Sequence, residues 1–366
     1  MDKIKSYFKN RSGLFIGLGV FTLLIRLIFG QMPSVVEAAY SNGFFLAIRY
    51  LLDYTIGLFP FPFSYLLFPT IVFLLIRRWW KRRKNEKGAW KQRLKLAGKN
   101  LLAAIGLVYF LFNFMWSFHY NRIPIDQHLG MQLDSLSLEA LCLEADWVAR
   151  RAEAARINIL GSDDDSLRYV PNQNLLEVEV RSNIEETMHL MGYPSAGRIR
   201  GRLITPGGWM LRIGIAGVYN PFTGEGNVSS AQIPEKWAFT MAHEMSHACG
   251  FGDEGTCNFV GMIACEQSDD PYVQYSGRMA YWRHLAQEIV AIDPLLYKML
   301  RHSFSLGVKA DLTASYNNSR KYAGKIAKIG RGVNNAYLRA QGVKEGIKSY
   351  DRVVLMRAAW HKKTGQ

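Results

Sequence analysis

Three runs of apolar residues in the first third of the chain restrict its fold more than any other feature. They cover residues 13–30, 58–76 and 101–118. Each run is close to the roughly 20 residues that a helix needs to cross a bilayer. Three buried core helices would show a similar composition, but the basic residues that flank the runs favour membrane spans. The sequence therefore predicts a transmembrane region over residues 1–120 with three spanning helices.

Basic residues are distributed unevenly around these runs. Residues 1–120 carry 17 Lys and Arg against 4 Asp and Glu, and eleven of the 17 lie between residues 77 and 99. Because cytoplasmic loops of membrane proteins are rich in Lys and Arg, the N-terminus and the 77–99 loop are expected on the cytoplasmic side. Three crossings then place residues 121–366 outside the cytoplasm. We therefore expect a multi-pass protein of the cytoplasmic (inner) membrane, with the lipid bilayer as a partner.

The net charge of +15 does not indicate a nucleic-acid-binding protein. The excess of basic residues lies beside the apolar runs, and the chain after residue 120 carries 28 Lys and Arg against 26 Asp and Glu. No basic face with interleaved aromatic residues follows residue 120. No nucleic acid partner is therefore expected.

Outside the three runs, the patterns predict a mainly α chain with a small β part. Residues 35–56 are amphipathic and are expected along the outer membrane surface. Apolar residues repeat every three or four positions over 121–160 and 172–191 and again from Pro234 onward, which indicates helices. Between 197 and 230, frequent glycines and alternating apolar residues indicate short strands. The part after the third run is thus expected to form an extracytoplasmic α+β domain.

The segment from His243 to His247 reads H-E-M-S-H. A helix from Pro234 to Gly250 is predicted, because proline suits a first turn and glycine suits a C-terminal cap. This helix would place His243 and His247 on one face, where both imidazoles reach a single Zn²⁺. Glu244 would lie beside a metal-bound water and act as a general base. An ordinary helix with a polar stripe is the alternative, but apolar neighbours indicate that the histidines are buried and need partners.

A catalytic zinc site needs a third protein ligand, and two residues compete for this role. Asp253 has the spacing of the metzincin pattern H-E-x-x-H-x-x-G-x-x-H/D. Glu254 matches zincins whose third ligand is a glutamate on a second helix, and the apolar stretch that follows favours this choice. Asn258, one turn later, would orient a histidine ligand through its other ring nitrogen. We expect His243, His247 and Glu254 to bind one Zn²⁺, with Asp253 as the alternative third ligand.

Four cysteines, Cys142, Cys249, Cys257 and Cys265, all lie after the third apolar run. An oxidising compartment would permit disulfide bonds between them. The chain has no C-x-x-C pair, which argues against a thiolate zinc site. Small buried thiols are the expected state for at least two of the four.

The segment "GVYNPFTGEGNV", residues 217–228, is predicted to form an edge strand and turn beside the cleft. Zincins hold a peptide substrate as an added strand along such an edge. A purely structural turn is the alternative. Tyr219 and Asn220 of this segment are candidate cleft residues. Tyr281 and His284 are further candidates, and Tyr219, Tyr281 and His284 could each donate a hydrogen bond to a developing oxyanion.

Several long segments carry a family resemblance. They include "HYNRIPIDQHLGM", "GIAGVYNPFTGEGNV" and "HEMSHACGFGDEGTCNFVGMIACEQSDDPYVQYSGRMAYW". These segments resemble the bacterial polytopic membrane proteins catalogued as domain of unknown function 3810, which are regarded as zincin-like membrane metallopeptidases. The family pattern is similar to H-E-x-x-H, then G-F, then E-x-E-A-N-F. The chain keeps the first glutamate as Glu254 and departs from the pattern at Thr256 and Cys257.

These observations lead to one expected function and two alternatives. We expect a membrane-anchored zinc-dependent metallohydrolase, a peptidase that acts on peptides or proteins and uses Glu244 to activate a zinc-bound water. The first alternative is a non-catalytic zinc-binding envelope protein that binds a partner or a cell-wall polymer. The second is a hydrolase of non-peptide amides in the cell envelope. The resemblance implies the zincin-like fold and the peptidase activity.

Overall fold

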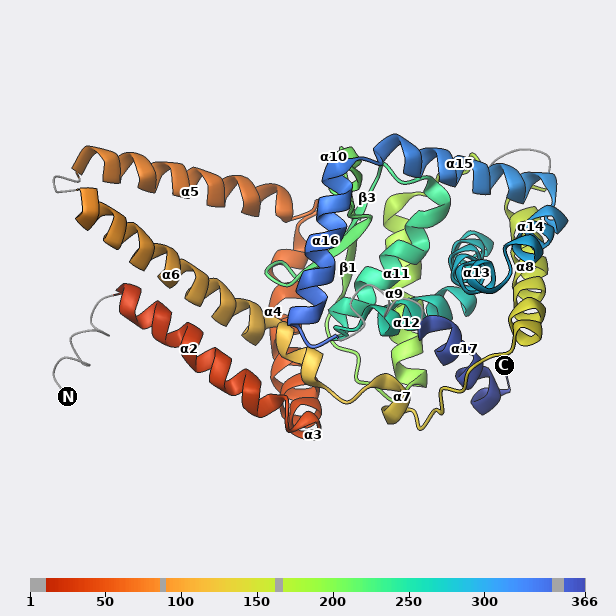
Figure 1. The fold of residues 1–366 in the computed structure, drawn as a ribbon, viewed down its shortest axis with the longest axis horizontal. Coiled ribbons are helices and arrows are strands. Elements are labelled where there is room, and N and C mark those ends of the chain that lie inside the picture. Colours follow the sequence, from red (N-terminus) through yellow and green to blue (C-terminus); the bar gives the residue numbers. More distant parts are fainter. Residues whose placement is uncertain (1–10, 86–89, 162–166, 344–351, 366) are drawn as a thin grey trace.

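The computed structural model describes residues 11–85, 90–161, 167–343 and 352–365. The described chain is mainly helical and contains a three-stranded mixed sheet. Three helices extend from one side of a larger body that holds the sheet and the other helices (Figure 1). These three are α2 (Arg11–Phe29), α5 (Ser64–Asn85) and α6 (Trp90–Met115).

Helices α2 and α6 are the two described helices that are long and apolar enough to cross a membrane. They pack closely at Gly19 and Gly106, where a Cβ on Gly19 would lie 2.7 Å from the Gly106 Cα. Small residues at such a crossing let two helix backbones approach each other. Arg26 Nη1 also donates to Asn113 Oδ1 at 3.0 Å, which satisfies polar side chains of the two helices. The first and third apolar runs therefore form a packed helix pair.

The second apolar run differs from the spanning helix expected over residues 58–76. Helix α5 begins only at Ser64, after the 3₁₀ turn η2 (Ile56–Leu58) and an irregular stretch. Pro60 and Pro62 explain the late start, because proline lacks an N–H and restricts the residue before it. The helix then continues into the basic segment, so it lacks the uniform apolar character of α2 and α6. Among the described helices, two rather than three are clear candidate spans.

The segment between the first two runs consists of α3 (Pro33–Val35), the π-helical η1 (Val36–Phe44) and α4 (Phe45–Asp53). One face of this amphipathic segment packs into the core of the body. Arg49 is 1% exposed; its Nη2 pairs with Asp53 at 2.5 Å and its Nη1 donates to the Tyr219 hydroxyl at 3.2 Å. A buried guanidinium needs such partners. The segment therefore connects the base of the extended helices to the sheet.

The sheet contains β1 (Arg200–Ile204), β2 (Gly217–Asn220) and β3 (Glu225–Ser229) in the spatial order β1-β3-β2. Strand β1 runs parallel to β3, and β2 runs antiparallel to it. The edge strand and turn expected over residues 217–228 are therefore present. The turn uses Gly224, whose φ of +72° suits a residue without a Cβ. The short helix α10 (Gly208–Arg212) connects β1 to β2.

The other helices of the body surround the sheet. Helix α8 (Leu138–Leu160) begins after Ser137, whose hydroxyl caps the helix by accepting a hydrogen bond from the Ala140 N–H at 3.2 Å. Helix α9 (Gln173–Leu190) agrees with the helix predicted over 172–191. The remaining elements are η3 (Ser117–Asn121), α7 (Ile125–His128), η4 (Pro234–Lys236), α11 (Trp237–Ala248), α12 (Glu254–Glu266), α13 (Pro271–Ile292), α14 (Pro294–Ser303), α15 (Leu306–Tyr322), α16 (Lys325–Ala340) and α17 (Arg352–Thr364).

Helix α11 lies in the centre of the body, where it packs against the sheet on one side and against α9, α12 and α13 (Figure 1). Met241 and Met245 on this helix are fully buried. Gly201 in β1 permits the close contact, because a Cβ there would clash with the Met241 side chain. The chemistry-bearing residues of α11 are therefore held between a sheet and a layer of helices.

Candidate metal centre

The ends of helix α11 agree closely with the helix predicted around the H-E-x-x-H segment. The 3₁₀ turn η4 starts at Pro234 and leads into α11, and Gly250 follows the helix with a φ of +87°. Proline at the start and a left-handed glycine after the end are the expected helix boundaries. His243 and His247 lie one turn apart on the helix, and their ring centroids are 4.9 Å apart.

Helix α12 brings Glu254 to the two histidines. Glu254 is the first residue of this helix, and its Oε2 lies 3.1 Å from His243 Nε2 and 3.5 Å from His247 Nε2. Ligands about 2.1 Å from one tetrahedral ion lie roughly 3.4 Å apart, so these separations suit a single zinc ion. Within the described residues, these three side chains form a buried group whose donor atoms all lie within 4.8 Å of one another.

The outer nitrogens of both rings are hydrogen-bonded. His243 Nδ1 donates to Asn258 Oδ1 at 2.8 Å, and His247 Nδ1 donates to the Phe251 carbonyl at 2.7 Å. A proton on Nδ1 leaves the lone pair of Nε2 directed toward Glu254. Asn258 lies on α12 one turn after Glu254, where the sequence predicts that it orients a histidine. Two imidazole nitrogens and one carboxylate form a donor set that fits Zn²⁺.

Asp253, the alternative third ligand, does not join this group. It caps the N-terminus of α12, where its Oδ2 accepts from both the N–H and the hydroxyl of Thr256 at 2.8 Å. Arg352 Nη1 lies 3.7 Å from the same oxygen. The carboxylate of Asp253 is therefore used to start the helix that presents Glu254.

Glu244 lies beside the histidines and against the sheet. Its side chain is 4% exposed, and a Cβ on Gly226 would lie 2.7 Å from the Glu244 Cβ. The backbone N–H of Tyr219 donates to its carboxylate. Burial raises the pKa of Glu244, while the imidazoles of His243 and His247 oppose this rise. A carboxylate whose pKa is raised in this way can accept a proton from a group placed beside it.

The charges of the three converging residues compensate one another. Burial acts to raise the pKa of Glu254, but the adjacent imidazoles hold this pKa well below its usual range. Burial disfavours the charged form of His247, yet the adjacent Glu254 carboxylate raises its pKa well above 6.5. The Cys257 thiol lies 3.2 Å from His247 Nδ1, and burial raises its pKa to about 12, so it stays protonated. A metal ion bound at the three side chains would replace the proton of the His247–Glu254 pair.

All four cysteines are free thiols, and two of them, Cys257 and Cys265, are buried. Burial raises the pKa of the Cys265 thiol above its usual value. A buried, protonated thiol behaves as a small apolar side chain. Cys257 and Cys265 therefore serve as packing residues in the core.

The side chains of the two predicted cleft residues on the edge strand make contacts within the protein. The Tyr219 hydroxyl accepts from Arg49, and its ring centroid lies 5.7 Å from that of Trp116. Asn220 starts the β2–β3 turn, where its Oδ1 accepts from the Phe222 N–H at 3.1 Å. These two side chains hold the strand and turn in place, so neither is free to contact a substrate.

The two candidates on α13 have different surroundings. The Tyr281 hydroxyl donates to Glu144 of α8 at 3.2 Å, so it is used between these two helices. His284 Nδ1 is buried and has no hydrogen-bond partner among the described residues. Burial lowers the pKa of His284 to about 4, and the nearby His243 contributes to this shift. His284 is therefore neutral at physiological pH and lies near His243 of the candidate metal site.

Three aromatic residues beside the candidate metal site are not predicted by any sequence pattern. Trp116 Nε1 donates to the His247 carbonyl at 2.8 Å, and the Tyr120 hydroxyl donates to that of Tyr337 at 3.3 Å. Burial raises the pKa of both tyrosines, and Glu254 adds to the rise at each. Trp116 immediately precedes η3, Tyr120 lies in η3 and Tyr337 lies in α16; these elements are far from α11 in sequence, so no local periodicity points to them.

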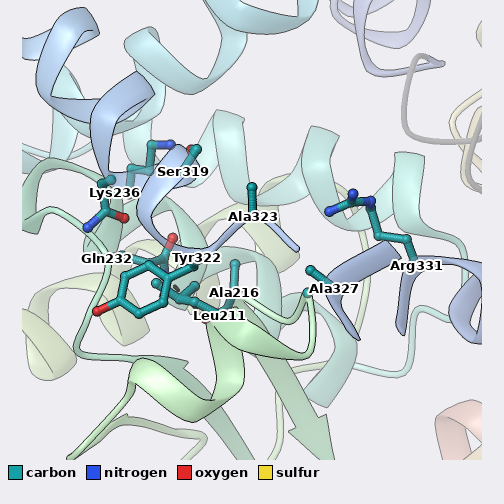
Figure 2. Close-up of a pocket in the computed structure, with 11 residues that line it drawn as sticks. Leu211, Ala216, Gln232, Lys236, Ser319, Tyr322, Ala323, Ala327 and Arg331 are labelled. Carbon is teal, nitrogen blue, oxygen red and sulfur yellow. Dashed lines mark hydrogen bonds between the residues drawn. The ribbon is translucent and has the colours of Figure 1, made fainter. Parts of the chain in front are cut away.

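A cavity of about 220 Å³ lies among α10, α15 and α16 (Figure 2). Ala216, which precedes β2, lines the cavity together with Lys236, which stands two helical turns before Glu244. Burial lowers the pKa of Lys236 to about 8, and the charge of Arg283 adds to this. The cavity therefore adjoins both the start of the edge strand and the helix that carries the H-E-x-x-H residues.

No curated protein and no solved structure matches the chain. A family model matches residues 40–356, a range that includes the three converging side chains, Glu244 and the aromatic residues beside them. This match covers most of the chain. The protein therefore belongs to the family described as protein of unknown function (DUF3810).

Proposed function

We propose that this protein is a membrane-anchored zinc-dependent metallohydrolase, and that it is a peptidase. The observation that carries the proposal is the convergence of His243, His247 and Glu254 with Glu244 beside them. A structural zinc site has no need of the carboxylate at Glu244, whereas a hydrolase needs a base next to its metal. Three protein ligands also leave a fourth position for water or substrate, as catalytic zinc sites require.

The residues around the centre would divide the chemistry of peptide hydrolysis. Zn²⁺ held by the three ligands would supply the Lewis acid for a water molecule and a substrate carbonyl. Asn258 and the Phe251 carbonyl keep the two imidazoles oriented through their outer nitrogens. Glu244 accepts a proton from the attacking water and delivers it to the leaving amine.

Two tyrosines and one histidine are candidates to stabilise the developing oxyanion. Tyr120 donates its hydroxyl proton to the oxygen of Tyr337, which leaves the Tyr337 proton free to donate elsewhere. The raised pKa of Tyr337, about 12 because of burial, keeps that proton in place at neutral pH. His284 is neutral and offers a ring N–H close to His243. We assign the oxyanion contact to Tyr337 first and to His284 second.

The edge strand β2 offers backbone groups to an extended peptide. The Ser229 N–H donates to the Ala216 carbonyl at 2.8 Å, which sets the alternation of hydrogen bonds between β3 and β2. By this alternation, Gly217 and Tyr219 direct their backbone groups to the open edge. The Tyr219 N–H already reaches Glu244. A substrate added as a strand would therefore pass Glu244, with the cavity beside Ala216 available to one of its side chains.

We further propose that α2, α5 and α6 span the inner membrane. The three helices leave the body on the same side, and the far ends of α5 and α6 lie next to each other (Figure 1). The basic residues at the end of α5 and the start of α6 lie at these far ends, as expected for the cytoplasmic side. In this arrangement the N-terminus and the 77–99 loop are cytoplasmic, and residues 121–366 are outside.

A non-catalytic zinc-binding envelope protein is the second candidate, and burial of the site favours it. His243, His247 and Glu254 are only 8%, 7% and 8% exposed. Closed, fully protein-coordinated sites are the rule for structural zinc. The wild-type protein would then hold about one zinc per chain and cleave nothing.

The decisive experiment compares wild-type protein with Glu244→Gln in nanodiscs. Zinc content is measured by mass spectrometry and hydrolysis with a broad peptide library. Glu186→Gln removes the same charge from an exposed position on α9 and serves as the matched control. We expect Glu244→Gln to retain zinc and lose hydrolysis, while Glu186→Gln retains both.

The outcomes separate the candidates. Undiminished hydrolysis by Glu244→Gln refutes the assigned general base. Zinc in the wild-type protein without cleavage of any peptide supports the non-catalytic candidate. Comparison of cell envelopes that carry wild-type or Glu244→Gln protein would then show which envelope polypeptides are cleaved.

A further inference from the structure

Helix α16 exposes a continuous apolar stripe. Ile326, Ile329 and Val333 are 63%, 65% and 63% exposed, and Ala336 and Ala340 continue the same row. Spacings of three and four residues place all five on one face of the helix. A different face contacts the body, because residues such as Ala327 and Leu338 are buried. The apolar stripe is therefore not the face that holds α16 on the protein.

The rest of the helix surface is basic. Lys325, Lys328, Arg331 and Arg339 are exposed, and the helix contains no acidic residue. Arg331 lines the cavity, whereas the other three lie beside the apolar stripe. A helix with an apolar face, a basic face and little net hydrophobicity is typical of segments that lie in the plane of a membrane interface.

The position of α16 agrees with this character. Its C-terminal end meets the body-side ends of the candidate spans: Arg26 Nη2 donates to the Gln341 carbonyl at 3.1 Å, and the ring centroids of Phe112 and Tyr337 are 6.3 Å apart. Figure 1 shows α16 crosswise at the base of the extended helices, beside α4. The exposed apolar surface of α2 and α6 is therefore continuous with the stripe.

We propose that α16 is an interfacial helix that lies in the outer leaflet of the bilayer, with its apolar stripe among the acyl chains and its basic side chains at anionic headgroups. This inference rests on the proposed membrane location of α2 and α6. The basic face matches the charge of anionic lipids, and the stripe continues the lipid-facing surface of the spans. Because Tyr337 lies on the same helix, this placement puts the candidate metal site close to the outer surface of the membrane.

Spin labels on the full-length chain test this placement. With the partly exposed native thiols Cys142 and Cys249 replaced by serine, the substitutions Ile329→Cys and Val333→Cys report on the stripe, and Lys328→Cys is the matched control on the basic face. Ile105→Cys on α6 reports on the membrane span itself. Each labelled protein is placed in nanodiscs that contain anionic lipid, and relaxation by oxygen is compared with relaxation by a water-soluble nickel chelate. All four positions are exposed, so folding is preserved.

We expect the ratio of oxygen to nickel relaxation at Ile329 and Val333 to exceed that at Lys328 several-fold. Equal ratios at the three positions, or exclusion of both reagents from the stripe, would overturn the inference, the latter because protein rather than lipid covers it. Oxygen-dominated relaxation at Ile105 with nickel access at Ile329 refutes only the role of α16. Nickel access at Ile105 refutes the membrane location itself.

The lipid composition tests the role of the basic face. Replacing the anionic lipid with a zwitterionic one is expected to lower the ratio at Ile329, because the attraction to the basic side chains is lost. A ratio that does not depend on lipid charge would overturn the assignment of these side chains to anionic headgroups.

Discussion

The two acidic residues that compete for the third ligand position give the sharpest test of the metal centre. Glu254 contacts both histidines, whereas Asp253 caps helix α12 through Thr256. Replacing each by alanine removes one carboxylate from adjacent positions. The two variants are therefore matched in charge and location and differ in the function of the side chain removed.

The expected magnitudes differ widely. Zinc sites with four protein ligands bind with roughly 10–16 kcal/mol, so one ligand contributes about 3–4 kcal/mol, or two to three orders of magnitude in Kd. Glu254→Ala should weaken zinc binding by that factor. Asp253→Ala removes an N-cap worth about 0.5–2 kcal/mol of folding free energy and leaves all three ligands in place. In a domain of this size it should lower Tm by roughly 1–8 °C and change Kd only a few-fold.

The assay is competition with a chelator of known zinc affinity, followed in the same samples by thermal unfolding with and without metal. Wild-type protein and Asp253→Ala should show zinc-dependent stabilisation, and Glu254→Ala should show almost none. If Asp253→Ala loses zinc and Glu254→Ala keeps it, the ligand assignment is wrong and the metzincin alternative is restored. If neither variant changes the affinity, the metal does not bind here.

Three further perturbations follow from the geometry. Asn258→Ala should weaken zinc binding by about 10–100-fold, because His243 loses its orienting partner, whereas Asn258→Asp should keep the affinity; chelator competition measures both. Gly226→Ala should destabilise the fold by about 1–3 kcal/mol in denaturant titrations, since the added Cβ would lie 2.7 Å from the Glu244 Cβ; unchanged stability would contradict the tight packing. The pKa of His284 is lowered to about 4 by burial, so its neutral form is the one that favours folding. The contribution of the neutral ring to folding stability is complete above about pH 6.5. It is lost as the pH falls toward 4, which lowers the free energy of unfolding by about 1–3 kcal/mol. His284→Leu should reduce this acid destabilisation; an unchanged pH profile would show that the ring stays accessible to protons.

Features that depend on neighbouring residues could be predicted from the sequence. The one-turn spacing of His243 and His247 and the boundaries of their helix agree with the structure. Each depends on backbone geometry within a few residues, where periodicity and capping preferences act directly. The first and third apolar runs were predictable for the same reason, because length and composition alone identify them.

The choice among side chains of similar chemistry depended on contacts between distant segments. Asp253 and Glu254 are adjacent and equally acidic, and only the packing of α12 against α11 directs one to the histidines and the other to its own helix. Tyr219 is drawn away from the cleft by Arg49, which belongs to the segment between the first two runs. Local pattern cannot specify such pairings, because they depend on which buried charges need partners.

What the sequence determined by itself is therefore the set of local units: two apolar helices, an H-E-x-x-H helix with its end caps, and a glycine-rich strand and turn. The tertiary structure decided which of these units meet. It placed Tyr337 from α16 beside Glu254 and shortened the second apolar run to a helix that begins at Ser64. The physical reason is range: helix and turn preferences act over a few residues, whereas side-chain packing and the pairing of buried polar groups join residues regardless of their separation along the chain.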